Sequence, residues 1–148
     1  MSDVFIIIPF VGIISFLLAV LTSAQIRKRD AGTAKMREIA QAISEGAHAF
    51  LKAEYRVLII FAIAMFFIIG IGLGSFVTAI CFLIGGLFST AAGYLGMTSA
   101  TKANVRTAQA AREGGMSKAL SIAFAGGSVM GLAVVGLGLF GVSLIYVL

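Results

Sequence analysis

The sequence predicts an all-α, multi-spanning membrane protein with four transmembrane helices, and two observations lead to this fold class. All 11 Lys and Arg residues fall within two windows, residues 27–56 and 102–118. Three stretches, residues 4–26, 57–101 and 119–148, contain no Asp, Glu, Lys, Arg or His. A bilayer segregates charge in this way because a charged side chain in hydrocarbon is costly. A hydrophobic content of 60% and a mean hydropathy of +1.09 agree, and they exclude an ordinary soluble domain.

The number of spans follows from length, since a helix needs about 20 apolar residues to cross a hydrocarbon core of about 30 Å. The first and last charge-free stretches each hold one span, and the longer middle stretch holds two. Gly70, Gly72 and Gly74 divide the middle stretch, because alternate glycines weaken a helix and suit a tight turn. We expect one membrane module over residues 1–148, with spans at about 4–25, 55–72, 76–98 and 118–146 and cytoplasmic segments at about 26–54 and 99–117.

The first cytoplasmic segment is predicted to be an amphipathic helix. Apolar side chains recur in it at spacings of three and four residues, namely Met36, Ile39, Ile43, Ala47 and Phe50. We expect this helix to run without a break into the second span. It is either a solvated extension of a membrane helix or a surface that contacts other cytoplasmic parts of the protein.

The second cytoplasmic segment is predicted to continue the third span as an alanine-rich helix as far as Glu113. Lys102, Arg106 and Gln109 lie with Glu113 along one side of this helix. The pair Gly114-Gly115 is expected to end it, as glycine commonly does after a helix.

The basic residues also predict the orientation of the chain. The connection between the first two spans carries seven Lys and Arg residues, the connection between the last two carries four, and the turn at residues 70–75 carries none. Lys and Arg next to spans stay on the cytoplasmic side, so both ends of the chain are expected on the other side. Nucleic-acid binding is disfavoured because no aromatic residues alternate with the basic ones to form a stacking platform.

Small residues are predicted to form packing seams on the spans. They recur in the third span as Gly85, Ser89 and Gly93, and in the fourth as Gly127, Gly131 and Gly138. Such seams let helix backbones approach closely, but they do not identify the partner helix. The single cysteine, Cys81, lies within the third span and is interpreted as a small apolar packing residue.

The sequence predicts no catalytic, cofactor-binding or metal-binding residue. The three apolar stretches at residues 4–26, 57–101 and 119–148 contain no Asp, Glu, Lys, Arg or His, whereas ion carriers usually place such a group within a span. His48 is the only histidine, and a zinc site needs three or four converging ligands. The carboxylates of the first basic window, Asp30, Glu38, Glu45 and Glu54, are interspersed with Lys and Arg, unlike those of a magnesium–phosphate site.

Three stretches resemble one family, the membrane-bound, ion-translocating pyrophosphatases. Residues 39–51 (IAQAISEGAHAFL) with 54–56 (EYR) resemble the start of the second helix of these pumps. Residues 93–97 (GYLGM), followed by 100–108 (ATKANVRTA) and 110–112 (AAR), resemble the cytoplasmic end of the third. Residues 123–132 (AFAGGSVMGL) resemble the fourth. The resemblance therefore covers the first four helices of the family, in its outer ring. The acidic loop that carries the family's chemistry has no counterpart in this chain, so no catalytic residue is carried over.

The resemblance implies a pyrophosphate-energised proton or sodium pump that hydrolyses magnesium pyrophosphate. It implies magnesium as the cofactor of the whole pump, potassium as an optional second ion, and none bound by this chain. The implied partners are the lipid bilayer, the remaining helices of the pump and a second copy in a homodimer. The implied location is the inner membrane of a prokaryotic cell. The apolar run at residues 142–148, without a polar tail, favours a longer protein.

Two functions remain open at this stage. The chain is either an inactive scaffold portion of such a pump or a freestanding four-helix structural or assembly subunit without activity. A small multidrug-type exporter is disfavoured because no carboxylate lies within a span. Within the pump, Lys102 and Arg106 either attract the anionic substrate or serve only anchoring and topology.

Overall fold

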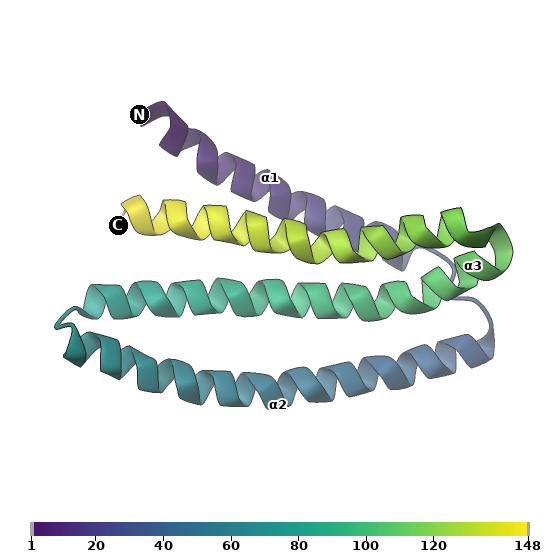
Figure 1. The fold of residues 1–148 in the computed structure, drawn as a ribbon, viewed down its shortest axis with the longest axis horizontal. Helices are drawn as coiled ribbons and strands as arrows, with labels where there is room; N and C mark the ends of the chain where they lie inside the picture. The colour runs from purple at the N-terminus through teal and green to yellow at the C-terminus, as the bar shows by residue number, and fades with distance from the viewer. Residues whose placement is uncertain (1, 148) are drawn as a thin grey trace.

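The computed structural model describes the backbone of residues 2–147 and the side chains of residues 7–146. It contains three α-helices, α1 (Ser2–Arg27), α2 (Ala34–Gly72) and α3 (Phe76–Val147). Figure 1 shows them lying alongside one another with their axes roughly antiparallel from one to the next. The predicted all-α class is confirmed, and each of the three helices is long and apolar enough to cross a membrane.

Helix α2 begins with a side-chain cap and runs through two chemical environments. Thr33 precedes it in extended conformation, and its Oγ1 accepts a hydrogen bond from the Met36 backbone N–H at 3.3 Å. This bond satisfies one of the free N–H groups at the start of the helix. The helix then continues without interruption from its charged first half into its apolar second half. The predicted continuity of this segment is therefore confirmed.

The turn between α2 and α3 forms where alternate glycines predicted a break. The Leu73 N–H donates to the Ile69 carbonyl at 3.0 Å and closes the last turn of α2. Gly74 follows with a φ of 64°, a left-handed conformation that glycine adopts without a steric penalty. The Ser75 hydroxyl then accepts a hydrogen bond from the Thr78 backbone N–H at 3.4 Å at the start of α3.

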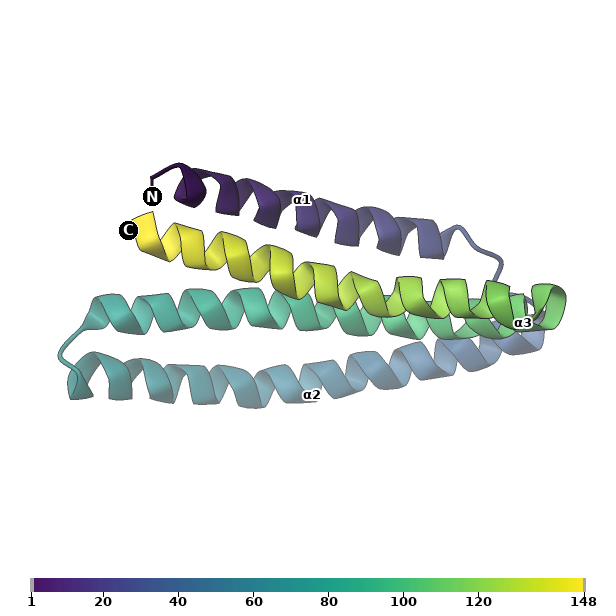
Figure 2. The ribbon, with the colours of Figure 1, turned by 45° about the horizontal axis from the view of Figure 1, so that its top comes forward.

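Helix α3 is bent back on itself at Gly115, which has a φ of 72° and a ψ of −171°. Figures 1 and 2 show the result as two arms that run antiparallel beside each other. We call residues 76–114 the first arm and residues 116–147 the second arm. The predicted helix end at Gly114-Gly115 is thus confirmed, because only glycine adopts this backbone conformation readily.

The interior of the molecule is built from small residues between α1 and the two arms of α3. Its buried members are Ala19, Ile26, Ala92, Ala103, Val129 and Ala133. A close backbone approach joins α1 to the second arm, where a Cβ added to Gly12 would lie 2.8 Å from the Gly136 carbonyl oxygen. The reciprocal Cβ on Gly136 would lie 2.7 Å from the Phe16 backbone nitrogen. The two helices therefore touch backbone to backbone, as small residues allow in membrane proteins.

The glycines of the predicted seams make no such approach within this chain. A Cβ added to Gly85, Gly93, Gly127, Gly131 or Gly138 would have no neighbouring atom within 4 Å. The close contacts use other glycines instead, such as Gly96 against Met130 and Gly141 against Phe88. The predicted seams are consequently open faces of α3 in the part of the protein described here.

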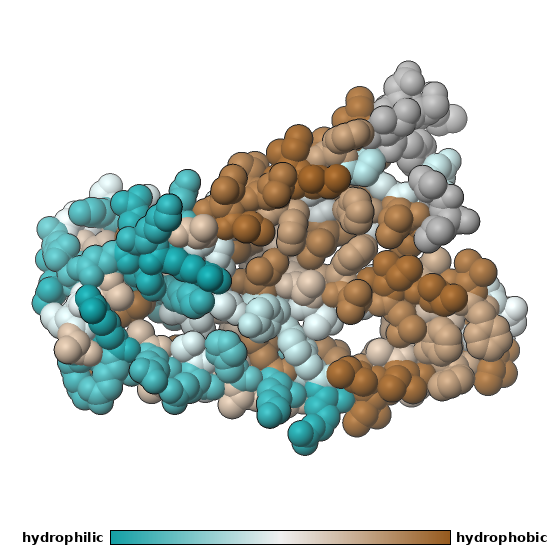
Figure 3. All heavy atoms as spheres, turned by 180° about the vertical axis from the view of Figure 1, so that it is seen from behind, coloured by the Kyte–Doolittle hydropathy of each residue, from teal (hydrophilic) through white to brown (hydrophobic). Residues whose placement is uncertain are grey.

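Polar and apolar side chains occupy opposite ends of the molecule. Figure 3 shows hydrophilic residues gathered at the end that carries the Gly115 bend, with hydrophobic residues covering the rest of that face. Large apolar side chains are widely exposed, including Ile71 at 73% and Phe124 at 74%. Such an exterior fits lipid or further apolar helices better than water.

Candidate functional site

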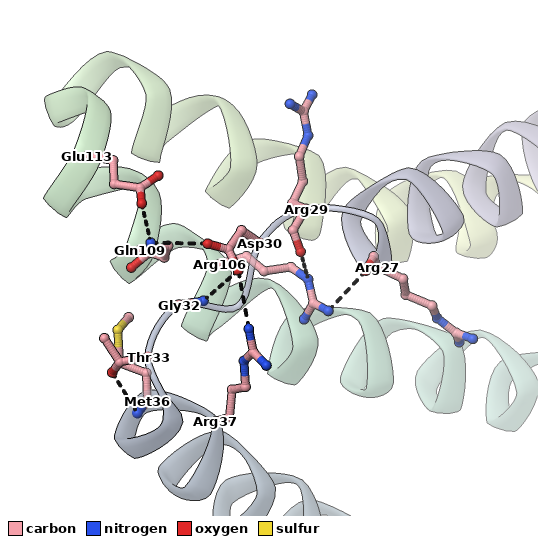
Figure 4. Close-up of polar contacts among 10 residues, drawn as sticks. All are labelled: Arg27, Arg29, Asp30, Gly32, Thr33, Met36, Arg37, Arg106, Gln109 and Glu113. Carbon is pink, nitrogen blue, oxygen red and sulfur yellow. Dashed lines mark hydrogen bonds and ion pairs between the residues drawn. The ribbon is translucent and has the colours of Figure 1, made fainter.

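Polar contacts between distant parts of the chain concentrate where the linker between α1 and α2 crosses the first arm of α3. Figure 4 shows this place, which we call the linker junction, with residues 27–33 lying against residues 102–113. The linker is short and leaves helix α1 with carbonyl groups that no further helical turn can satisfy. The side chains on one side of the first arm supply the missing partners.

Arg106 provides most of these partners. Its Nε donates to the Arg29 carbonyl at 3.0 Å, and its Nη2 donates to the Arg27 carbonyl at 3.1 Å. Its Nη1 donates to the Lys102 carbonyl at 2.8 Å within its own helix. A cation is favoured at the C-terminus of a helix because the aligned peptide dipoles end there with negative charge. Arg106 therefore caps α1 and attaches the linker to α3.

Asp30 is the acidic centre of the linker junction. Its Oδ1 accepts from the Gly32 backbone N–H at 3.0 Å and lies 3.7 Å from Arg37 Nη2, and its Oδ2 accepts from Gln109 Nε2 at 3.2 Å. The hydrogen bond from Gly32 is the main reason why the pKa of Asp30 lies below its usual value. Gln109 Nε2 also donates to Glu113 Oε1 at 2.6 Å, so one amide group bridges the two carboxylates.

Gln109 is almost completely buried, at 3% exposure, yet its Oε1 has no hydrogen-bond partner among the described residues. A Cβ added to Gly32 would lie 2.7 Å from this oxygen, and Gly32 itself has a φ of 80°. Glycine at this position thus lets the linker lie directly on the amide. Any larger residue would meet both the left-handed backbone and the crowded side chain.

Three cations meet beside the linker junction. Burial is the main reason why the pKa of Lys102 lies below its usual value, and the charges of Arg27 and Arg106 lower this pKa further. Burial and the charge of Arg27 likewise lower the pKa of Arg106. The predicted pair Lys102 and Arg106 is therefore joined by Arg27, which the sequence did not single out. Three hydrogen bonds tie Arg106 to backbone carbonyls. Its main role in this structure is therefore to anchor the linker, and binding of a substrate would be secondary.

Smaller polar contacts join the helices farther from the linker. Ser23 Oγ on α1 and Ser99 Oγ on α3 form a buried hydrogen bond of 2.8 Å. Tyr55 on α2 donates its hydroxyl to the Thr90 carbonyl on α3 at 3.1 Å. These bonds connect helix pairs where apolar contact supplies little drive for association.

The histidine and the cysteine take part in no cluster that could hold a metal. His48 Nδ1 lies 2.7 Å from the Ser44 carbonyl, and its ring meets Tyr94 edge-on at 6.4 Å between centroids. Cys81 is a free, half-buried thiol. Among the residues that the structure describes, no group of three or more His, Cys, Asp or Glu side chains could bind a metal ion. The absence of catalytic residues stays a prediction for the chain as a whole.

Sequence periodicity had placed Lys102, Arg106, Gln109 and Glu113 on one side of their helix, and the structure brings that side to the linker. Asp30 and Gly32 were not predicted as its partners. Contacts such as Arg106 to Arg29, 77 residues apart, leave no periodic signal in either segment. A turn-like Asp-Ala-Gly at residues 30–32 was the one local sign, since Asp often accepts from the N–H two residues on.

Comparison with known proteins identifies the family. The family described as inorganic H+ pyrophosphatase matches residues 13–148. The chain is 46% identical to a K(+)-insensitive pyrophosphate-energized proton pump of Methanosarcina mazei over 95% of its length, covering 21% of that protein. It is 50% identical to a putative K(+)-stimulated pyrophosphate-energized sodium pump of Clostridium tetani over 82% of its length, covering 18% of that protein.

A third relative, the K(+)-stimulated pyrophosphate-energized sodium pump of Thermotoga maritima, is 38% identical over 99% of the chain. The chain spans about a fifth of the length of these relatives. The match extends over nearly all of the chain, and the long apolar helices are those of an integral membrane protein. This chain therefore belongs to the inorganic H+ pyrophosphatase family.

Proposed function

We propose that this chain is the N-terminal part of a pyrophosphate-energised cation pump that couples hydrolysis of magnesium pyrophosphate to ion transport. One observation carries the proposal: the family match covers residues 13–148, while the chain accounts for only about a fifth of each pump that it resembles. Relatives named as proton pumps and as sodium pumps match at comparable identity, so either ion fits.

The role proposed for this part is that of a scaffold. The carboxylates at the linker junction do not fit a magnesium site, because Gln109 bridges Asp30 and Glu113 where a metal would need to lie. The charged groups there are used to attach the linker to α3. Magnesium, with potassium as an optional second ion, would then bind in the rest of the pump.

The proposed topology has four spans, with both arms of α3 crossing the membrane. It assigns spans to about residues 4–25, 55–72, 76–98 and 118–146 and cytoplasmic segments to about 26–54 and 99–117. The gathering of hydrophilic residues at the Gly115 end supports it. So does the common position of the two chain ends and the Gly74 turn at the opposite end in Figure 1. Both ends would face away from the cytoplasm of a prokaryotic cell.

Single introduced thiols test this topology in sealed inner-membrane vesicles. Thiols at Lys28 and at the exposed Met116 should react with a membrane-impermeant reagent from the cytoplasmic side only. A thiol at the exposed Leu73, beside the Gly74 turn, should react from the opposite side only. Reaction of the Lys28 and Leu73 variants from the same side would refute the four-span arrangement. Replacing Cys81 with Ala removes the one natural thiol of this chain from the assay.

Phosphate release tests the pump assignment. The protein at its natural length, in sealed vesicles with magnesium and pyrophosphate, should release phosphate and build up either a proton or a sodium gradient. Residues 1–148 alone should release none, because the catalytic groups are proposed to lie elsewhere. Absence of hydrolysis by the natural-length protein would refute the pump, whereas hydrolysis by residues 1–148 would refute the scaffold role. We also propose that the whole protein is a homodimer, which light scattering on the natural-length protein purified in detergent would test.

A further inference from the structure

Three cations, Arg27, Lys102 and Arg106, lie near one another beside the linker junction, and anchoring of the linker uses only the Arg106 side chain. Arg27 is the last residue of α1, and Lys102 and Arg106 lie one turn apart on the first arm of α3. The Arg106 guanidinium spans the gap, with Nη2 on the Arg27 carbonyl at 3.1 Å and Nη1 on the Lys102 carbonyl at 2.8 Å. The three side chains thus start from one small area.

The charge of this area is not balanced within the described part of the chain. Asp30 is the nearby carboxylate, and it is already bonded to Gly32 and Gln109 and paired with Arg37. No ion pair among the described residues joins Arg27 or Lys102 to a carboxylate. Lys102 and Arg106 are half-buried, and the exposed charge of Arg27 beside them makes their charged forms less favourable, so a bound anion would reduce that cost.

Hydrogen-bond donors are left over for such an anion. A guanidinium carries five N–H groups, and three of those on Arg106 point to carbonyls. One N–H remains on each of its terminal nitrogens, in addition to the free donors of Arg27 and Lys102. Figure 4 shows the Arg27 side chain directed away from the Asp30 network, along α3. Phosphate groups favour several charged N–H donors of this kind.

The position of Arg27 at the end of the apolar helix α1 favours the phosphate of a lipid headgroup over a free phosphate ion. Arg27 lies on the same face of α1 as the apolar residues Ile13 and Val20, which precede it by 14 and 7 residues and are each 43% exposed. An anionic phospholipid can lay its acyl chains on this face and bring its headgroup to the level of Arg27, whereas a free phosphate cannot use the apolar surface. We propose that Arg27, Lys102 and Arg106 bind the phosphate headgroup of an anionic phospholipid. This site does not depend on the pump activity.

The experiment is a lipid-binding titration on the natural-length protein in neutral detergent, followed by native mass spectrometry. Phosphatidylglycerol should bind more tightly than phosphatidylcholine. The double variant Arg27→Gln/Lys102→Gln should weaken phosphatidylglycerol binding about fivefold for each cation removed, and so about 25-fold in total. The control Arg112→Gln/Lys118→Gln removes the same charge from exposed positions on α3, and it should change the affinity by less than about twofold.

Several outcomes would overturn the proposal. Equal losses in the two double variants would mean that only the overall charge of the molecule attracts the lipid. Equal affinity for the two lipids would exclude a headgroup site. Competition by inorganic phosphate at the same concentration as the lipid would assign the cations to a free anion instead. Lys102→Arg, which keeps the charge, should retain the affinity, and helix content by circular dichroism should be the same in all variants.

Discussion

Replacing Arg106 with Gln should release the linker between α1 and α2. The change removes two long-range hydrogen bonds, to the carbonyls of Arg27 and Arg29 at 3.1 and 3.0 Å. A bond from a charged donor contributes about 1.5–3 kcal/mol when well buried, and solvent screening at this partly exposed site lowers that to about 1 kcal/mol each. Loss of the repulsion of Arg106 with Arg27 and Lys102 offsets part of the cost. We therefore expect local opening of the linker to become easier by about 1–2 kcal/mol.

Limited trypsin digestion measures this opening, because Arg27, Lys28 and Arg29 are themselves cleavage sites in the linker. When opening and closing are fast relative to cleavage, the cleavage rate follows the open population. A change of 1–2 kcal/mol should then raise the rate at these sites by about 5–30-fold. Arg106→Lys should recover only a small part of the protection, since an ammonium group cannot reach both carbonyls as the guanidinium fork does.

Arg112→Gln is the matched control for the Arg106 variants. Arg112 is exposed on the same arm of α3, and no hydrogen bond or ion pair ties it to another described residue. In the Arg112→Gln variant, trypsin should cleave the linker between α1 and α2 at the wild-type rate. The anchoring role would be refuted by linker cleavage in Arg106→Gln that stays within about twofold of wild type under fast-opening conditions.

Three further predictions concern other contacts. Gly12→Ala should cost about 1–3 kcal/mol in thermal unfolding, because its Cβ would lie 2.8 Å from a backbone oxygen of α3, and a neutral result would contradict this packing. Ser23→Ala and Ser99→Ala should each cost about 1 kcal/mol, with the double variant costing little more than either; additive costs would show that the two hydroxyls do not interact. The pKa of Asp30 is lowered in the folded state, so its contribution to the free energy of unfolding is complete above the unfolded pKa of about 3.9. This contribution is lost as pH falls through the lower folded pKa. The thermal midpoint of Asp30→Asn should therefore fall less at acid pH than that of the wild type, and identical pH profiles would contradict the prediction.

Charge pattern and glycine position were sufficient to predict the helical rods of this protein. Exclusion of charge from hydrocarbon sets where the apolar segments lie, and a left-handed backbone needs glycine, so the positions of the glycines in the sequence predicted the bends at Gly74 and Gly115. The continuity of α2 from its charged half into its apolar half followed from an unbroken helical period. These are local properties of the chain.

The partners of each helix face could not be predicted in the same way. Helix α3 carries small residues on several faces, and periodicity identifies each face without saying which one meets α1. The contact between Gly12 and Gly136 depends on how two helices that are far apart in sequence cross in space. The attachment of Asp30 to Gln109 across 79 residues is of the same kind. Such contacts are fixed by tertiary packing, for which a single sequence holds no periodic signal.

Experiment can test whether the glycines of α3 that have no close neighbour in this chain lie against a further helix. Gly85 and Gly138 line an apolar groove of about 230 Å³ between the two arms, and neither has a neighbour within 4 Å of an added Cβ. Helices in lipid gain little from apolar contact alone, so an exposed small-residue face matters only where another helix packs on it. Gly85→Leu should therefore leave the thermal stability of residues 1–148 unchanged or slightly raised, because leucine favours helix over glycine by up to about 1 kcal/mol. In the natural-length protein, the same substitution should lower the stability by about 1–3 kcal/mol if a further helix lies on this face. Equal effects in the two proteins would show that no further helix packs on this face.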